Sequence, residues 1–319
     1  DGDIKTRDDF SGTWTRLRAR SLGLESRDLR WDHNRQGNWG YYFEYNEIPR
    51  FEPLEVTTPV TGIGTPNLTC VGAPAVGCPG AVSVPVDIQS KRQRYSLGFD
   101  KMFTSKWGFN VDFRNEEKKG ERIFGMGGPT NFSFTPEPLD STIRLLEATA
   151  RFTDTKFQIV GGYYGTQYRN ELRTLTHTYG DGTTDGTLIL NPLVLPPDNQ
   201  SHQLHVTGGY SFNPTTRGTF KAAYTQATQD DTYVEPTING RTDLGGKIET
   251  TLLQAGISAR PMPKLSITGN LRYEDRDDKT PITQYFLGTG TTQGFNEPRS
   301  FKNTFGKLEG SYALPQGFR

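Results

Sequence analysis

The sequence has little of several features that mark common protein classes. It contains 2 cysteines and 3 methionines in 319 residues, and its 36 basic and 36 acidic residues cancel. No stretch approaches the roughly 20 consecutive apolar residues of a membrane-spanning helix, so such a helix is excluded. Because the chain has no net charge, no overall field attracts nucleic acid, and we expect no nucleic-acid partner.

The two cysteines, Cys70 and Cys78, lie in the longest uncharged stretch, residues 56–86, which prolines and glycines interrupt. We interpret residues 50–90 as one long loop, because each proline removes a backbone donor. Neither cysteine belongs to the Cys-x-x-Cys-His pattern of covalent haem attachment, so we expect no cofactor in this chain. A disulfide between the two would close a small ring, and two free thiols are the alternative.

No group of side chains predicts catalysis, and we expect the chain not to be an enzyme. His202 and His205 are three residues apart, so on a strand they point to opposite faces and cannot hold one metal ion. Acidic residues cluster at 229–231 and at 274–278, where calcium is one interpretation and solvated charge is the simpler one. We therefore assign no metal ligand.

Turn-forming and aromatic residues are abundant instead. The chain has 36 glycines, 20 prolines and 12% aromatic residues, although only 33% of its residues are hydrophobic. A disordered chain would have few aromatic and β-branched residues, and a helical protein would have less glycine. The composition therefore favours an all-β protein that is rich in turns.

Alternation of apolar and polar residues is the dominant pattern along the chain. It is clearest in residues 38–46, 107–114 and 265–274, where one face is apolar or aromatic and the other mostly polar. Weaker copies occur at residues 13–20, 24–33, 95–103, 143–152, 157–168, 203–212, 218–226, 250–259 and 303–312. The pattern predicts about 11–12 antiparallel strands.

The connections between these segments alternate in length. Short links join strands into hairpins, and long loops separate the hairpins. We expect the long loops at residues 50–90, 121–140, 174–200, 230–246 and 277–300. All tight turns would then lie at one end of the sheet and all long loops at the other. A soluble sandwich mixes its connections between both ends, whereas an outer-membrane barrel sorts them in this way.

Alternation also predicts which side chains face lipid and which face the lumen. A ten-residue strand spans roughly 33 Å, or about 23 Å along the membrane normal when tilted by 45°, which matches the apolar band of a barrel. The residues expected to face lipid are Phe43, Phe109, Val111, Ile267 and Leu271. Those expected to face the lumen are Glu44, Asn110, Asp112, Asn270 and Arg272. Several Trp and Tyr residues would form an interfacial girdle.

We interpret residues 1–319 as a single transmembrane β-barrel domain. The last predicted strand is followed by an apparent turn at residues 314–317, and barrels of this kind usually end on a strand. We expect further strands in a longer protein, because backbone groups in lipid must be paired. The alternative is an even set of about twelve strands that closes by itself.

Three blocks of the sequence resemble the MtrB/PioB family of decahaem-associated outer-membrane barrels. The first is SLGLESRDLRWDHNRQGNWGYYFEYNEIPRF at residues 21–51. The second is PEPLDSTIRLLEATARFTDTKFQIVGGYYGTQYRN at 136–170, and the third is LPPDNQSHQLHVTGGYSFNPTTRGTFKAAYTQATQDD at 195–231. Together they cover about a third of the chain, and some relatives carry an N-terminal Cys-x-x-Cys that is missing here.

The resemblance implies a porin-like sheath in the bacterial outer membrane. A periplasmic multihaem c-type cytochrome would lie in the lumen and carry electrons across the membrane, often to an extracellular multihaem cytochrome or a mineral. The haem would belong to the partner. The alternatives are a diffusion porin or substrate-specific channel, in which charges gather at a constriction, and an extracellular carbohydrate-binding or adhesive β-protein with a closed apolar core.

Overall fold

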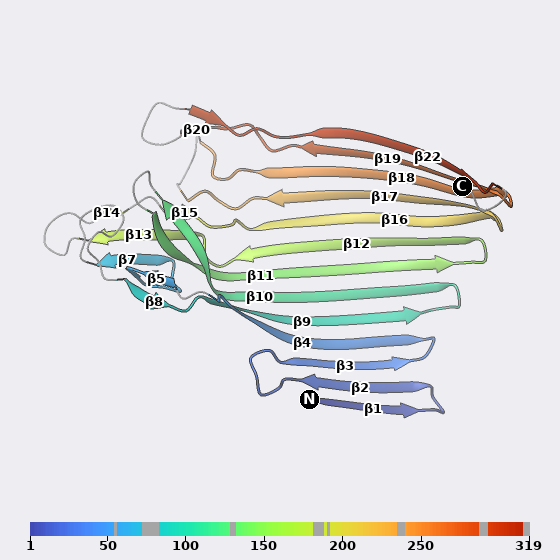
Figure 1. Ribbon diagram of the computed structural model, residues 1–319, viewed down its shortest axis with the longest axis horizontal. Coiled ribbons are helices and arrows are strands. Elements are labelled where there is room, and N and C mark those ends of the chain that lie inside the picture. The colour runs from blue at the N-terminus through green and yellow to red at the C-terminus, as the bar shows by residue number, and fades with distance from the viewer. Residues whose placement is uncertain are drawn as a thin grey trace.

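The computed structural model describes residues 1–53, 56–71, 83–127, 132–180, 188–189, 192–234, 240–286 and 293–314, and all regular secondary structure in these ranges is β-strand. A 13-stranded sheet dominates (Figure 1). Its strands, in spatial order, are β1 (Gly2–Asp8), β2 (Thr13–Arg20), β3 (Asp28–Arg35), β4 (Trp39–Phe51), β9 (Gln89–Met102), β10 (Trp107–Gly127), β11 (Phe132–Thr153), β12 (Phe157–Asn170), β16 (Asn199–Asn213), β17 (Thr216–Gln229), β18 (Gly246–Met262), β19 (Leu265–Asp278) and β22 (Phe301–Tyr312).

Each of these strands pairs antiparallel with the next one in that order. β1 and β22 form the two edges of the sheet and do not pair with each other. Among the described residues, no helix has the length and apolar character needed to cross a bilayer.

The two ends of the sheet carry different connections (Figure 1). Tight turns at residues 9–12, 36–38, 103–106, 154–156, 214–215 and 263–264 all lie at one end, called here the turn end. Gly12 and Gly37 in two of these turns have φ of +66° and +69°, a conformation that suits glycine. The longer connections lie at the opposite, loop end, so the predicted sorting is confirmed in outline.

The loop end nevertheless contains two short connections. Residues 21–27 join β2 to β3, and residues 128–131, outside the described ranges, separate β10 from β11. The predicted long loop at residues 121–140 is therefore wrong, because most of it is strand. In this part of the β10–β11 hairpin, charged and small residues replace the apolar alternation, so the sequence carries no strand signal although backbone pairing continues to Gly127↔Phe132.

The strand count also exceeds the prediction of 11–12, because β1 was missed. Its sequence GDIKTRD contains one apolar residue and is exposed throughout. β1 is held to β2 by a continuous register from Gly2↔Ala19 to Asp8↔Thr13. A polar edge strand of this kind produces no alternation that sequence analysis can detect.

The long loops contain short strands of their own. The connection from β4 to β9 and the connection from β12 to β16 meet in a small sheet, where β7 pairs parallel with β13. Its core consists of Val60, Leu68, Leu175 and Leu195. The short strands are β5 (Val56–Thr58), β6 (Val60–Thr61), β7 (Asn67–Val71), β8 (Val84–Val86), β13 (Thr174–Gly180), β14 (Leu188–Ile189), β15 (Leu193–Val194), β20 (Gln284–Phe286) and β21 (Gln293–Phe295).

Burial differs sharply between the small sheet and the large one. Leu68 and Leu175 in the small sheet are 1% exposed, as in the core of a soluble protein. Leu97, Leu204 and Leu271 in the large sheet are 51%, 62% and 55% exposed. A soluble sheet buries such residues, so the exposed apolar face of the large sheet indicates a non-aqueous environment or a partner.

Candidate functional site

The strand register sorts the predicted site residues onto two opposite faces. Residues opposite each other in neighbouring strands share a face, so a row can be followed across the sheet. One such row runs Trp107, Phe152, Ile159, Gly208, Phe220, Ala255 and Leu271. It shows that β10 and β19 present their predicted apolar residues on one face, called here the apolar face.

Phe43, Phe109, Val111, Ile267 and Leu271 all lie on the apolar face. The other face, called here the polar face, carries Glu44, Asn110, Asp112, Asn270 and Arg272. The members of each group therefore share one face, although they lie on three different strands, β4, β10 and β19.

Aromatic rings cross the apolar face near the turn end. Trp107 packs on Phe152 at 4.9 Å between ring centroids, and Phe152 lies 6.3 Å from Phe157. The line continues from Phe157 to Tyr210 at 6.5 Å and ends at Phe212, 5.1 Å further on. Four strands, β10, β11, β12 and β16, thus share one belt of rings on their turn side, which is the arrangement of an interfacial girdle.

A second set of rings lies closer to the loop end of the same face. The rings of Tyr45 and Tyr95 are 4.9 Å apart, and the Tyr163 hydroxyl lies 2.7 Å from His202 Nδ1. Beyond these rings the apolar face becomes charged, beginning with Glu47, to which Lys91 Nζ donates at 3.0 Å. The apolar band is therefore bounded by aromatic residues at both of its ends.

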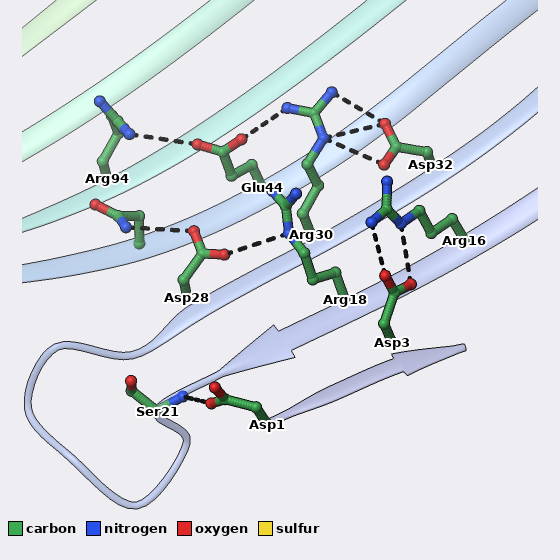
Figure 2. A network of polar contacts seen from close by, with 11 residues as sticks. Asp1, Asp3, Arg16, Arg18, Ser21, Asp28, Arg30, Asp32, Glu44 and Arg94 are labelled. Carbon is green, nitrogen blue, oxygen red and sulfur yellow. Dashed lines mark hydrogen bonds and ion pairs between the residues drawn. The ribbon is translucent and has the colours of Figure 1, made fainter. Parts of the chain in front are cut away.

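The polar face of β1, β2, β3, β4 and β9 carries a network of ion pairs, called here the charged panel (Figure 2). Arg30 donates through Nε and Nη2 to Asp32 at 3.0–3.2 Å and through Nη1 to Glu44 at 2.7 Å. Arg94 donates to the other oxygen of Glu44 at 3.3 Å. One carboxylate thereby joins three strands, because Arg30, Glu44 and Arg94 lie on β3, β4 and β9.

The panel extends to both sides of Arg30. Towards β10, the Arg30 guanidinium lies 4.3 Å from the ring centroid of Tyr42, whose hydroxyl donates to Asp112 at 2.8 Å. Towards the sheet edge, Arg16 donates twice to Asp3, at 2.6 and 3.0 Å. The charges are therefore neutralised mainly by neighbours within the sheet, which ties six adjacent strands together.

The polar face of β12 and β16 has a different chemistry. Its described residues, called here the neutral panel, include no Asp, Glu, Lys or Arg. They are Gln158, Val160, Gly162, Tyr164, Thr166, Tyr168 and Asn170 on β12, and Asn199, Ser201, Gln203, His205, Thr207, Gly209 and Ser211 on β16. This panel offers hydroxyls, amides and glycines across a broad uncharged surface.

Carboxylates at the turn end are held by the turns themselves. The backbone N–H of Thr155 donates to Asp154 at 2.8 Å, and Lys106 Nζ donates to the same carboxylate at 3.1 Å. These contacts hold the pKa of Asp154 below its ordinary value. The β9–β10 and β11–β12 turns are thereby linked outside the apolar band.

The remaining predicted site residues are not gathered with these panels. His202 and His205 lie on opposite faces, as their spacing predicts. Cys70 lies in β7, whereas Cys78 is outside the described residues, so the disulfide remains a prediction. Within the described ranges, no group of three or more His, Cys, Asp or Glu side chains is arranged to hold a metal ion.

Sequence analysis named Glu44 and Asp112 as lumen-facing residues, but it did not find Arg30 and Arg94, which bind Glu44. The sequence signal for these ion pairs was the presence of Arg30 and Asp32 two residues apart, on the same face of one strand. Partners on other strands require the register, and the long connection between β4 and β9 hides the pairing of Glu44 with Arg94 from local analysis.

Comparison with known proteins agrees with this architecture. Residues 1–319 match the family described as "Putative outer membrane beta-barrel porin, MtrB/PioB". The chain belongs to this family. It is an outer-membrane protein, all-β, and its sheet corresponds to part of a barrel wall. The family is one of porins and not of enzymes.

One curated relative is "Outer membrane protein MtrB" of Shewanella baltica (strain OS185). It is 24% identical over 334 residues, which cover 100% of this chain and 48% of the relative. The chain thus spans about half the length of that relative.

Solved outer-membrane proteins show only a general likeness. OmpT of Vibrio cholerae has a TM-score of 0.37 at 12% identity, covering 97% of this chain and 88% of its own. The ferric-catecholate import receptor Fiu of E. coli K12 has a TM-score of 0.40 at 11% identity, covering 98% and 60%. A likeness of this size bears on neither binding nor transport.

Proposed function

We propose that this chain forms part of a barrel wall that sheathes a periplasmic multihaem c-type cytochrome and so supports electron transfer across the outer membrane. In this proposal the apolar face, with Val111 and Leu271, contacts lipid. The polar face, with Glu44 and Arg272, lines the lumen. The haem groups belong to the partner, and a second multihaem cytochrome outside the cell is the expected electron acceptor or donor.

The observation that carries the proposal is the breadth of the polar face. Its charged groups form ion pairs from β1 to β9 and again on β19, where Arg272 pairs with Glu274 at 2.7 Å, and the uncharged neutral panel lies between these two regions. A soluble protein packs well against a broad surface of satisfied polar groups. Membership of the MtrB/PioB family supports the same assignment.

Side-chain exposure supports placing the polar face inside. On β9, Ser96 and Gly98 of the polar face are buried, with Ser96 at 5% exposure, whereas Leu97 and Phe99 of the apolar face are 51% and 44% exposed. Side chains converge on the concave side of a curved sheet and diverge on its convex side. The pattern therefore favours a concave polar face, as in a barrel lumen.

The unpaired edges at β1 and β22 bear on closure. Unpaired strand edges are unfavourable in lipid, and the curated relative is about twice the length that this chain covers. We propose that further strands of the full-length protein pair with these edges.

Electron transfer across proteoliposomes tests the proposal. Full-length barrel and cytochrome together are expected to reduce an acceptor enclosed in the vesicle when a reductant is added outside. Barrel alone and cytochrome alone serve as controls and should not. A haem stain of the detergent-extracted complex gives an independent readout, and absence of both transfer and retained haem contradicts the sheath role.

A diffusion pore is the second candidate, because the family is described as a porin. In that case, purified barrel would conduct small ions strongly in planar bilayers and retain no haem protein. Addition of the cytochrome would leave the conductance unchanged. For a sheath, the cytochrome should instead block most of the conductance, so one bilayer experiment separates the two functions.

A further inference from the structure

Two pairs of like charges face each other between β9 and β10, beyond the loop-side aromatic rings. Lys119 lies opposite Lys91 on the apolar side of the sheet, and Lys118 lies opposite Arg92 on the polar side. Like charges directly opposite each other destabilise a sheet. The two pairs are adjacent in sequence, so their surroundings can be compared directly.

The outer pair is compensated by carboxylates. Lys91 Nζ lies 3.0 Å from Glu47, and Lys119 Nζ lies 3.7 Å from Asp140. On the inner side Arg92 lies 3.6 Å from Glu116. Within the described residues, Lys118 has neither an ion pair nor a hydrogen bond, although it is half-buried. The inner pair thus leaves one ammonium group without a partner.

The other cations nearby increase the imbalance. Burial and the charges of Arg122, Arg92 and Arg50 lower the pKa of Lys118, and Glu116 opposes them. Arg122 is itself bound to Glu137 by two hydrogen bonds at 2.7 and 2.9 Å. The carboxylate of Glu137 is therefore committed to another cation.

Lys118 lines a cavity of about 190 Å³ on the polar face. Ser141 lies directly opposite Lys118 on β11, and Tyr168 of β12 also lines the cavity. Neither hydroxyl has a hydrogen bond to another described residue. Three acidic residues, Glu116, Glu137 and Asp140, also line the cavity, and each is paired with another cation: Arg92, Arg122 and Lys119 respectively. The cavity accordingly gathers an ammonium group and two hydroxyl donors next to carboxylates that are bound to other cations, in a volume suited to a few heavy atoms.

We propose that this cavity binds a small oxyanion, a phosphate or carboxylate group, through Lys118, Ser141 and Tyr168. The oxygens of a phosphate or a carboxylate group have enough lone pairs to accept from all three donors, and charge-assisted hydrogen bonds are the stronger kind. The group comes either from a free anion in the lumen or from an acidic side chain or propionate of another molecule there. The site does not depend on the cytochrome assignment, since the barrel alone contains all three donors.

Titration calorimetry on the purified full-length barrel tests the site, with inorganic phosphate and acetate as probes in a sodium chloride background of fixed ionic strength. Wild type should bind at least one probe above that background. Lys118→Gln should weaken binding about tenfold or more, and Lys118→Arg should retain most of it. Tyr168→Phe should weaken it about threefold to tenfold.

Lys91→Gln is the matched control, because Lys91 lies on the opposite face of the sheet, pairs with Glu47 and does not line the cavity. It should bind as wild type does, and heat-modified gel mobility confirms that each variant is folded. Preference for phosphate identifies a free oxyanion, and equal or tighter binding of acetate identifies a carboxylate group. The proposal is wrong if neither probe binds, or if Lys118→Gln and Lys91→Gln lose binding equally.

Discussion

The charged and neutral panels lie on the same face of one sheet, but they differ in how their side chains are paired. In the charged panel, Glu44 is shared by Arg30 and Arg94, and further ion pairs continue to the β1 edge. The neutral panel has no ion pair, and some of its side chains bind the neighbouring strand β17: Gln203 donates to Thr225 at 2.8 Å, and Thr207 donates to the Phe220 carbonyl at 3.1 Å. The polar groups of the charged panel mostly bind each other within the sheet, whereas many of those in the neutral panel can bind another molecule.

This difference in side-chain pairing indicates which part of the polar face contacts a partner protein. Half-buried ion pairs that neutralise each other add rigidity and register to the sheet, but they offer little to a second molecule. Uncharged hydroxyls and amides accept close approach without a large desolvation cost. We therefore expect the neutral panel to form the closest contact with the cytochrome and the charged panel to hold the wall in shape.

The largest expected effect on folding stability comes from substitutions on the apolar face, opposite both panels. Val111→Arg places a charge in the middle of the apolar band and should reduce folding stability in lipid vesicles by about 2–4 kcal/mol. Asn110→Arg, one residue away on the polar face, should cost less than about 1 kcal/mol. Urea titration of both variants in vesicles measures the difference. Equal costs would contradict the assignment of the faces, and a larger cost for Asn110→Arg would reverse it.

The charged panel should be sensitive to loss of its shared acceptor. Glu44 is 17% exposed in its side chain, and Glu44→Gln removes the charge that holds both Arg30 and Arg94. We expect a loss of about 1–3 kcal/mol in the same urea titration. Glu309→Gln is the control: its pair with Lys307 is more than half exposed, so it should cost under about 1 kcal/mol.

The neutral panel should be sensitive in binding but not in folding. Thr166→Arg introduces an unpaired charge beneath the partner and should weaken retention of the cytochrome about tenfold, or about 1.4 kcal/mol. Thr166→Ser should retain the haem protein as wild type does. Haem absorbance per barrel after washing provides the measurement, and undiminished retention in Thr166→Arg would place the contact elsewhere.

The smallest effect is expected at the turn end. Because the pKa of Asp154 is lowered in the folded protein, its contribution to stability is present above the ordinary aspartate pKa of about 3.9 and is lost as the pH falls through the folded value. Asp154→Asn should therefore melt slightly below wild type at pH 7, and the two melting curves should converge in acid. A difference that grows in acid would contradict this sign.

The fold was largely predictable from the sequence where apolar and polar residues alternate along a strand. Phe109 and Val111 alternate with Asn110 and Asp112, and the register places the two pairs on opposite faces. Prediction failed where a strand has no apolar face, as in β1 and the distal part of β10, since backbone pairing leaves no compositional trace. The unpartnered Lys118 was equally invisible, because its isolation depends on which charges lie across the sheet.

The parallel pairing of β7 with β13 has a consequence for how the protein assembles. Asn67 pairs with Thr176, so roughly a hundred residues of chain separate the two halves of that contact. Contacts between such distant segments form slowly, because loop-closure entropy must be overcome first. We expect the small sheet to close late, after β9 to β12 are in place, and its buried Leu68 then fastens the loops of the finished wall together.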